Sequence, residues 1–447
     1  MRHIDFLIDR FQTRRDADAV VWRDRTFSYG DLCEAIDRAS EQIQRNAIRR
    51  GSVVSLEADF SPAAIAMLLA LIAHECVIVP LTLAVEGNKP ALRRIAEVET
   101  IIDISSEDIA VAKATGVAAT HPIIRTLRER RHPGLVIFSS GSTGTSKAAL
   151  HDLVPLVDQF RMPGLPVRAI SFLLFDHIGG INTLFSILGN GGCLVVAQER
   201  SPEQVCKAIA RHRPELLPVT PTFLNLLLVS EAYRRWDLSS LKIVSYGTEV
   251  MPSATLRRLQ TVLPHVKAVQ KYGSSELGIL QSKTRPGDAL WLRIGDERCR
   301  IRVVDGMLEV RTPAAMLGYL NAPNPFTPDG WFPTGDAVEV DGEYMRVLGR
   351  RSQMINIGGE KVHPAEIENV LQEMDGVVDV VVTAEPHLIA GHIAKARVQL
   401  STTETLEQFR TRMRRFCRDK LPRFKIPQRV ELATDDLHAA RFKKLRA

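Results

Sequence analysis

The chain lacks paired cysteines. Its six cysteines are spread over 447 residues, with no Cys-x-x-Cys pair and no spacing typical of metal ligands. Scattered cysteines of this kind are typical of small buried side chains in a reducing compartment. The distribution argues against a disulfide framework and a cysteine metal site for Cys33, Cys76, Cys193, Cys206, Cys299 and Cys417.

Long apolar runs are also missing. The longest, Ala63–Ala73, ends at His74 and Glu75 and is too short to span a bilayer, so a buried helix is expected. The first residues, MRHIDFLIDRF, are charged every few positions and contain no apolar signal core. No repeat or low-complexity tract is present. We therefore expect a cytoplasmic protein without a membrane span.

Neither sign of charge is in large excess. The 58 Lys and Arg residues exceed the 52 Asp and Glu residues by a net charge of +6. This balance suits an anionic ligand but is too diffuse to indicate nucleic-acid binding. No nucleic-acid partner is therefore expected.

What the chain does contain is an alternation of strand and helix patterns. At 447 residues it is long enough for two or more domains, and 45% hydrophobic content is ordinary for a globular protein. Asp31–Ile48 carries apolar residues on one helical face, and Cys76–Leu81 is typical of a buried strand. This alternation predicts an α/β fold with parallel-rich sheets and helices on their faces.

The sequence texture changes in the last third of the chain. Short alternating strands separated by Asp-Gly turns predict a β-rich subdomain over about 291–348. The last hundred residues predict a compact α+β unit. Helices are expected there over Pro364–Met374 and, rich in Arg and Lys, over Leu406–Leu421.

The most distinctive stretch is Phe138–Leu150, FSSGSTGTSKAAL, which comes after an apolar strand-like segment. Its glycines let the backbone approach an anion, and its hydroxyl and N–H groups can hold phosphate oxygens. Lys147 adds a positive charge. A Walker loop is excluded, because Ser146 stands where the second glycine belongs and Ala148 where the magnesium-binding hydroxyl belongs. A flexible Ser/Thr/Gly linker is the alternative.

Several other strand-like segments end in polar, Gly-rich turns. These turns are Asp176–Gly180, Gly247–Glu249 and Tyr272–Glu276. In open α/β sheets, ligands bind at the carboxyl ends of strands. One ligand lying across these strand ends would account for the pattern. A structural role is the alternative for His177.

Four motifs together resemble the adenylate-forming superfamily, which contains acyl- and aryl-CoA ligases, firefly-type luciferases and nonribosomal adenylation domains. SSGSTGTSKA (139–148) resembles its phosphate loop, and YGSSE (272–276) resembles its Y-G-x-T-E motif. GWFPTGD (330–336) resembles G-W-x-x-T-G-D, and residues 349–368 resemble the family's hinge region and the segment after the hinge. The resemblance covers nearly the whole chain and implies an N-terminal adenylation core over 1–350 and a mobile C-terminal domain over 351–447.

The resemblance implies a two-step reaction. A carboxylate attacks the α-phosphate of ATP, pyrophosphate leaves, and a thiol captures the acyl adenylate. Chemistry of this kind depends on positioning and charge neutralisation. The residues that the resemblance assigns to ATP and AMP are Ser139, Ser140, Gly141, Ser142, Thr143, Gly144, Lys147, Gly247, Thr248, Glu249, Tyr272, Gly273, Asp336 and Arg350.

The same resemblance implies further roles. Glu276 is expected to bind Mg²⁺, which prefers carboxylate and phosphate oxygens. Ser275 is expected to contact the α-phosphate or the acyl carboxylate, and His177 to lie beside the acyl pocket and the incoming thiol. Asp336 is expected to accept hydrogen bonds from the ribose, assisted by Arg350.

The C-terminal domain departs from the family pattern at two places. Ser352 occupies the hinge, where Asp or Lys is usual. The catalytic lysine normally lies in P-R-T-x-x-G-K-x-x-R, whereas this tail contains two adjacent lysines in LHAARFKKLR (437–446). Spacing from Lys425 favours Lys443 over Lys444 as its equivalent. A basic chain end without a catalytic role is the alternative.

The thiol acceptor is coenzyme A in the favoured interpretation. Gly358, Gly359 and Glu360 resemble the Gly-Gly-x run that admits pantetheine in CoA-using relatives. The cluster of basic residues over 410–425 could bind the phosphates of CoA or an acidic carrier protein that bears phosphopantetheine. The short stretch between Leu81 and Gly134 leaves few elements to enclose a long acyl tail. An acid–CoA ligase is thus the first hypothesis; a carrier-loading ligase and a degenerate nucleotide-binding protein are the alternatives.

Overall fold

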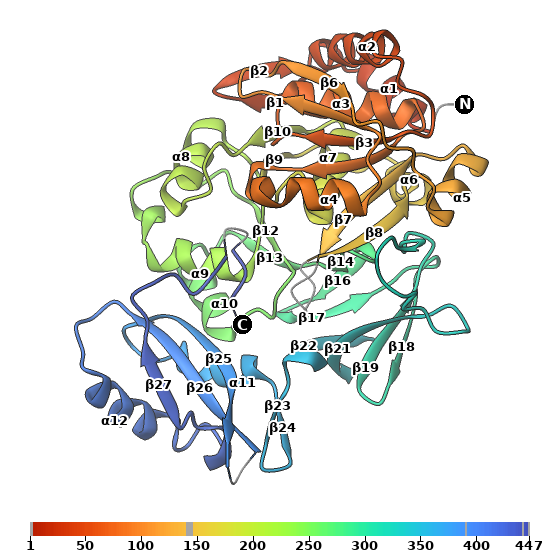
Figure 1. The fold of residues 1–447 in the computed structure, drawn as a ribbon. Helices are drawn as coiled ribbons and strands as arrows, with labels where there is room; N and C mark the ends of the chain where they lie inside the picture. The colour runs from red at the N-terminus through yellow and green to blue at the C-terminus, as the bar shows by residue number, and fades with distance from the viewer. Residues whose placement is uncertain (1–2, 140–145, 389–390, 440–441, 446–447) are drawn as a thin grey trace.

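A computed structural model describes residues 3–139, 146–388, 391–439 and 442–445. Figure 1 shows a large N-terminal region, coloured red to teal, above a smaller C-terminal domain coloured blue. The tail of the chain leaves the blue domain and returns to the N-terminal region beside α9 (Pro221–Val229) and α10 (Ser253–Val262). In the described ranges, no helix is both long and apolar enough to cross a bilayer.

Two seven-stranded sheets form the N-terminal framework, as the βα alternation predicts. The first is parallel except for its edge hairpin, in the order β13 (Lys267–Gln270), β12 (Ile243–Tyr246), β11 (Leu216–Val219), β9 (Arg168–Ser171), β10 (Cys193–Val196), β1 (Asp18–Trp22) and β2 (Arg25–Ser28). The second is mixed, in the order β20 (Gly318–Tyr319), β8 (Lys147–Asp152), β7 (Gly134–Ser139), β4 (Val77–Leu81), β3 (Val53–Glu57), β5 (Thr100–Ile104) and β6 (Ala110–Ala114).

Helices cover both faces of these sheets. One large core combines residues of the two sheets with α2 (Tyr29–Arg45), α3 (Pro62–Ala73) and α7 (Ile178–Gly189). The predicted apolar helix is α3; Ser61 caps its N-terminus, and its all-round apolar surface is buried. The outer faces are covered by α4 (Lys89–Ile95) and α5 (Pro122–Arg130) on one sheet, and by α8 (Pro202–His212), α9 and α10 on the other. The short helices α1 (Asp5–Gln12) and α6 (Leu153–Asp158) complete the region.

The β-rich subdomain is an antiparallel six-stranded sheet that starts earlier than expected, at Ser282. Its order is β16 (Ser282–Arg285), β17 (Asp288–Ile294), β22 (Tyr344–Arg350), β21 (Phe332–Asp341), β19 (Met307–Arg311) and β18 (Arg300–Val304). The small hairpin of β14 (Tyr272–Ser274) and β15 (Gly278–Leu280) precedes it. The early start was not predicted because β16 (SKTR) is polar and gives no apolar alternation.

The C-terminal domain has its own core of β-strands and two helices. Helix α11 (Pro364–Leu371) starts as predicted but ends before the predicted Met374, and α12 (Leu406–Cys417) ends before the predicted Leu421. Pro422 disfavours helix at Leu421 itself. The sheet contains β24 (Glu360–Val362), β23 (Ile355–Ile357), β26 (Gly391–Leu400) and β25 (Val377–His387), with β27 (Arg429–Leu432) parallel to β26.

Polar contacts join the two regions. Asn225 Nδ2 donates a 2.8 Å hydrogen bond to the Val378 carbonyl, and Arg257 pairs with Glu373 at 2.5 Å. Both side chains of the Arg257–Glu373 pair keep contact with solvent. The interface between the regions therefore includes hydrogen bonds and ion pairs that water can replace.

Candidate active site

The phosphate-loop motif spans a β-hairpin rather than a strand and a helix. Ser139 is the last residue of β7 and pairs with Lys147, the first residue of β8. A Walker loop leads into a helix, so the structure agrees with its exclusion from the sequence. The positions Ser140, Gly141, Ser142, Thr143 and Gly144 lie outside the described residues.

Asn321 holds the base of this hairpin. Its Oδ1 accepts a hydrogen bond from the Ala148 N–H at 2.9 Å, and its Nδ2 donates to the Ser146 carbonyl at 2.8 Å. One side-chain amide thus satisfies two backbone groups at the point where the chain leaves the motif. The sequence motifs gave no signal for Asn321.

Tyr319 connects the two residues expected to handle phosphate and metal. Its hydroxyl donates a 2.8 Å hydrogen bond to Glu276 Oε1, and the Lys147 Nζ lies 5.3 Å from its ring centroid. Strand β20 places Tyr319 there by pairing with β8, where Tyr319 lies opposite Ala149. Burial and the Glu276 carboxylate raise the pKa of the Tyr319 phenol. Tyr319 was also missed by sequence analysis, because its role depends on this pairing.

His151 supports the turn that carries Ser275 and Glu276. It is fully buried on β8, with Nε2 2.6 Å from the Ser275 carbonyl and Nδ1 3.2 Å from the Ala314 carbonyl. Burial lowers the pKa of this imidazole. A neutral imidazole has one N–H, so it can donate to only one of the two carbonyl groups. The shorter distance favours a donated bond to Ser275.

A second cluster lies where the hairpin meets the β-rich sheet. The Tyr272 hydroxyl donates a 2.6 Å hydrogen bond to Asp336 Oδ2, and Arg350 Nε lies 3.3 Å from Asp336 Oδ1. Asp336 and Arg350 are directly paired on β21 and β22. Burial raises the pKa of Asp336, while the Arg350 charge and the Tyr272 hydrogen bond oppose that shift. A carboxylate held in this way can accept hydrogen bonds from vicinal hydroxyl groups.

The turn after β12 is tightly packed against the segment before β14. A Cβ on Gly247 would lie 2.7 Å from the Lys271 carbonyl oxygen, and a Cβ on Gly273 would lie 2.3 Å from the Gly278 carbonyl oxygen. Thr248 has a left-handed φ of 73°, which is uncommon for a residue with a side chain. The Glu249 carboxylate accepts a 2.7 Å hydrogen bond from Thr222 Oγ1. The glycines expected to bind nucleotide are thus also required by packing.

His177 caps helix α7. Its Nδ1 accepts a 3.0 Å hydrogen bond from the Gly179 N–H. If neutral, the ring therefore carries its proton on Nε2. The structural role that the sequence left open is present, and it fixes the ring beside the first turn of α7.

A cavity of about 210 Å³ lies between α7 and the carboxyl ends of β11 and β12. Its walls combine apolar side chains such as Leu173 and Ile187 with the turn residues Gly247, Thr248 and Gly273. Pockets for drug-sized ligands occupy about 300–1,000 Å³, so this cavity suits a short chain or a single ring. It adjoins the turns expected to hold the nucleotide and is the candidate pocket for the acyl group.

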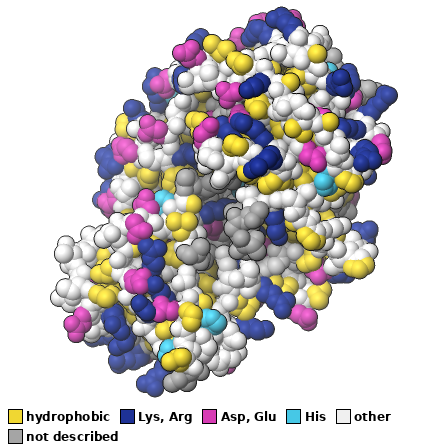
Figure 2. All heavy atoms as spheres, viewed as in Figure 1, with side chains coloured by type: hydrophobic (Ala, Val, Ile, Leu, Met, Phe, Trp, Pro, Cys, Tyr) yellow, Lys and Arg dark blue, Asp and Glu magenta, His cyan; other side chains and the backbone are white. Residues whose placement is uncertain are grey.

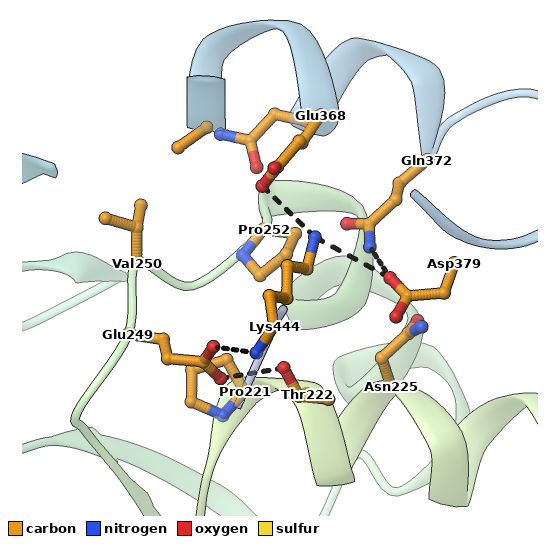
Figure 3. Close-up of a pocket in the computed structure, with 12 residues that line it drawn as sticks. Pro221, Thr222, Asn225, Glu249, Val250, Pro252, Glu368, Gln372, Asp379 and Lys444 are labelled. Atoms are coloured by element: carbon orange, nitrogen blue, oxygen red, sulfur yellow. Dashed lines mark hydrogen bonds and ion pairs between the residues drawn. The ribbon is translucent and has the colours of Figure 1, made fainter. Parts of the chain in front are cut away.

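The tail contacts both regions beside this site. Figure 3 shows Lys444 between Glu249 of the N-terminal region and Glu368 and Asp379 of the C-terminal domain. Its backbone N–H donates to Glu249 at 2.9 Å, and its Nζ lies 3.2 Å from Glu368 and 3.6 Å from Asp379. The Lys444 side chain is 8% exposed. These contacts assign Lys444 an anchoring role.

Phe442 anchors the other side of Lys443. The Phe442 carbonyl accepts a 2.9 Å hydrogen bond from Thr220, and its ring packs against Phe172 and Phe223. Lys443 is half-buried. The tail therefore carries Lys443 between two anchored neighbours, next to α9 and the turn after β12.

The expected hinge and thiol-channel residues lie apart from the strand ends. Ser352 is exposed in the short turn Arg351–Gln353 that comes after β22. Gly358 and Gly359 form the exposed two-residue turn of the β23–β24 hairpin, which points away from the N-terminal region (Figure 1). Both have positive φ (60° and 95°), and nothing lies within 4 Å of a Cβ at either position. In this arrangement the turn geometry, rather than close packing, requires the glycines and leaves Glu360 exposed.

A metal site built from protein groups alone is not evident. Within the described residues, no group of three or more His, Cys, Asp or Glu is arranged to hold a metal ion. Mg²⁺ is commonly held by one or two carboxylates together with phosphate oxygens and water. Glu276, close to Lys147 through Tyr319, fits that mode of binding.

Strand-end turns line one cavity, and the tail contacts Glu249 in the turn after β12. The class of protein is an adenylate-forming enzyme. The family model "AMP-binding enzyme" matches residues 85–320, and its C-terminal domain model matches residues 366–444. The chain belongs to the AMP-binding enzyme family.

Individual relatives agree with this assignment. The chain is 26% identical to an indoleacetate–CoA ligase of Aromatoleum aromaticum, over 92% of this chain and 90% of that protein. It is 25% identical to a 2-succinylbenzoate–CoA ligase of Enterococcus faecalis, over 75% of each. The fold matches a crystal structure of the anthranilate–CoA ligase AuaEII with anthranoyl-AMP, with a TM-score of 0.83 at 19% identity, covering 100% of this chain and 95% of that one.

Proposed function

We propose that this protein is an ATP-dependent acid–CoA ligase. The observation that carries the proposal is the junction at Tyr319, which brings Lys147 and Glu276 to opposite parts of one side chain. A cation and a carboxylate so placed suit a polyphosphate and its Mg²⁺. The similarity to CoA ligases over most of the chain supports the same activity.

The first step forms the acyl adenylate. An oxygen of the substrate carboxylate bonds to the α-phosphorus of ATP, and the bond from that phosphorus to the β-phosphate oxygen breaks, releasing pyrophosphate. Lys147 neutralises charge on the departing phosphates, and Mg²⁺, held at Glu276, would supply further neutralisation when bound. Asp336 accepts hydrogen bonds from the ribose hydroxyls, with its orientation fixed by Tyr272 and Arg350.

Lys443 is the proposed electrostatic donor of this step. Charge grows where the acyl oxygen meets the α-phosphate, and an ammonium group aimed there stabilises the transition state. The anchored neighbours Phe442 and Lys444 support this assignment, since they fix the backbone on both sides of Lys443.

The second step transfers the acyl group to a thiol. The sulfur of CoA bonds to the acyl carbon, the bond to the AMP oxygen breaks, and AMP leaves. We propose that rotation about Ser352 then replaces the tail with the Gly358–Gly359 turn. This agrees with the exposed position of that turn and with an interface made partly of exchangeable polar contacts.

A basic surface on the C-terminal domain supports a phosphorylated acceptor. Figure 2 shows Lys and Arg side chains gathered over this domain. Arg412, Lys420 and Lys425 pair with carboxylates there, whereas Arg414, Arg415 and Arg418 are exposed. Such a surface suits the phosphates of CoA; an acidic carrier protein is the second candidate acceptor.

The test uses pyrophosphate exchange. The purified protein is incubated with ATP, Mg²⁺, labelled pyrophosphate and a panel of short aliphatic and aryl acids. Acid-dependent exchange supports the ligase. Nucleotide binding without exchange for any acid supports a degenerate nucleotide-binding protein instead. CoA and a phosphopantetheinylated carrier protein, supplied separately to the active mixture, then distinguish the two acceptors by the thioester formed.

A further inference from the structure

The acyl cavity contains one lysine that the proposed mechanism does not use. Lys271 lies between β13 and β14 and borders the cavity. Lys271 is exposed to solvent. Among the lining residues in the described part of the chain, Lys271 is the one with a formal charge.

The ammonium group of Lys271 has no anionic partner among the described residues. Among the described residues, none forms a hydrogen bond or an ion pair with its Nζ. Desolvation lowers the pKa of this lysine, and no carboxylate of the described residues opposes the shift. An exposed ammonium group at the wall of a cavity is available to an anionic group of a ligand.

Lys271 borders a different space from the one proposed for the ribose. The next residue, Tyr272, donates a hydrogen bond from its hydroxyl to Asp336, the proposed ribose ligand. The lining of the acyl cavity includes Lys271 and neither Tyr272 nor Asp336.

Neutral polar groups lie across the same cavity. Asn182 and Ser186 are one turn apart on α7, so they share a face of that helix, and both line the cavity. Gln281 lines it from the segment after β15. A purely aliphatic acyl chain would leave these groups and the ammonium without partners.

We infer that the substrate is a short carboxylic acid with a second carboxylate, which forms an ion pair with Lys271 while the first carboxylate is activated. This inference rests on the proposed ligase function and specifies its substrate class. The small cavity volume limits the distance between the two carboxylates.

The experiment compares acids of matched chain length in the exchange assay: glutarate against pentanoate, and adipate against hexanoate. The parent is expected to prefer the diacid by about ten- to a hundredfold in kcat/KM, the scale of one charge-assisted contact. Lys271→Met should lose this preference and gain activity with the monoacid, and Lys271→Arg should keep it. Lys267→Met, an exposed lysine at the start of β13, is the matched control and should behave like the parent.

Three results would overturn the inference. The first is a parent that uses monoacids as well as diacids. The second is a Lys271→Met variant with an unchanged diacid preference. The third is an equal loss with both acids in that variant, which would place Lys271 at the activated carboxylate. If the parent shows no pyrophosphate exchange with any acid, the ligase proposal is overturned, and this inference falls with it.

A pH series gives an independent readout. Because desolvation lowers the pKa of Lys271, its positive charge disappears at a lower pH than that of an ordinary lysine. The diacid preference of the parent should therefore fall as the pH rises from 7.5 to 9.5. Lys271→Arg, whose guanidinium stays charged, should keep a constant preference. Parallel profiles for the two proteins would contradict the inference.

Discussion

At the scale of single residues, Tyr319 links two of the residues expected in the site. It belongs to none of the four motifs, yet it contacts the lysine of the first and the glutamate of the second. Its hydroxyl and its ring contact different partners, so the two contacts can be separated by mutation. The role proposed for the junction can thus be tested one group at a time.

Removal of the hydroxyl should weaken the use of MgATP. Tyr319→Phe leaves the ring near Lys147 but removes the donor to Glu276, so kcat/KM for MgATP should fall roughly tenfold, as for one hydrogen bond to a charged group. Tyr319→Leu also removes the cation–π contact and should cost a further few-fold, or about 0.5–1 kcal/mol. Exchange kinetics at varied MgATP measure both; parent-like values in both variants would remove Tyr319 from the site.

At the scale of elements, strand β8 connects the buried core to the residues of the candidate active site. It starts at Lys147 and ends at Asp152, and between them His151 reaches the carbonyl of Ser275. The same strand pairs with β20 and so places Tyr319. A change inside β8 therefore acts on the turn of Ser275 and Glu276 through the fold.

The buried imidazole of β8 should make stability depend on pH. Burial lowers the pKa of His151, so below about pH 6.5 the unfolded chain takes up a proton that the folded protein does not. The free energy of unfolding should then fall with decreasing pH, by at most about 1.4 kcal/mol per pH unit for one proton.

Thermal unfolding of parent and His151→Gln between pH 7.5 and 5.0 measures this effect. The variant should start with a lower Tm, and it should lose less on acidification. His363, whose pKa is also lowered by burial, is present in both proteins and cancels in the comparison. An identical pH dependence would show that His151 does not titrate in this range.

Local patterns predicted the elements better than their contacts. The α/β alternation, the buried helix Pro62–Ala73 and the order of the motifs could be recognised because periodicity and turns are local. The contributions of Asn321 and His151 could not, since each bonds to backbone more than 120 residues away. The proposed role of Lys271 could not be predicted from the sequence either, because it depends on the cavity that the fold forms beside this residue.

At the scale of the whole molecule, the tail is where the two regions meet. Its two lysines are adjacent in sequence, but we expect Lys444 to have a structural role and Lys443 a catalytic one. Lys444 forms buried ion pairs with Glu368 and Asp379, both 3% exposed at the side chain. Lys443 is the proposed donor for adenylation, so the sequence preference for Lys443 stays a prediction that the contacts of Lys444 support.

Half-reactions distinguish the two lysines. Lys443→Ala should lower adenylation by roughly two to three orders of magnitude, on the scale of one transition-state donor. Thioester formation from a supplied acyl adenylate should fall far less. Lys444→Ala leaves two buried carboxylates without their cation, so the free energy of unfolding should drop by about 3–5 kcal/mol. A selective adenylation defect in Lys444→Ala, without loss of Tm, would exchange the two assignments.

The polar character of the contacts between the two regions also affects the speed of the catalytic cycle. Contacts such as Asn225 to the Val378 carbonyl and Arg257 to Glu373 can be replaced by water without exposing an apolar core. If the C-terminal domain turns as proposed, the tail contacts of Phe442 and Lys444 must also break, and friction from the solvent would add to that cost. Turnover with CoA should decrease as glycerol raises the viscosity, whereas pyrophosphate exchange, which needs no turning, should hold its rate.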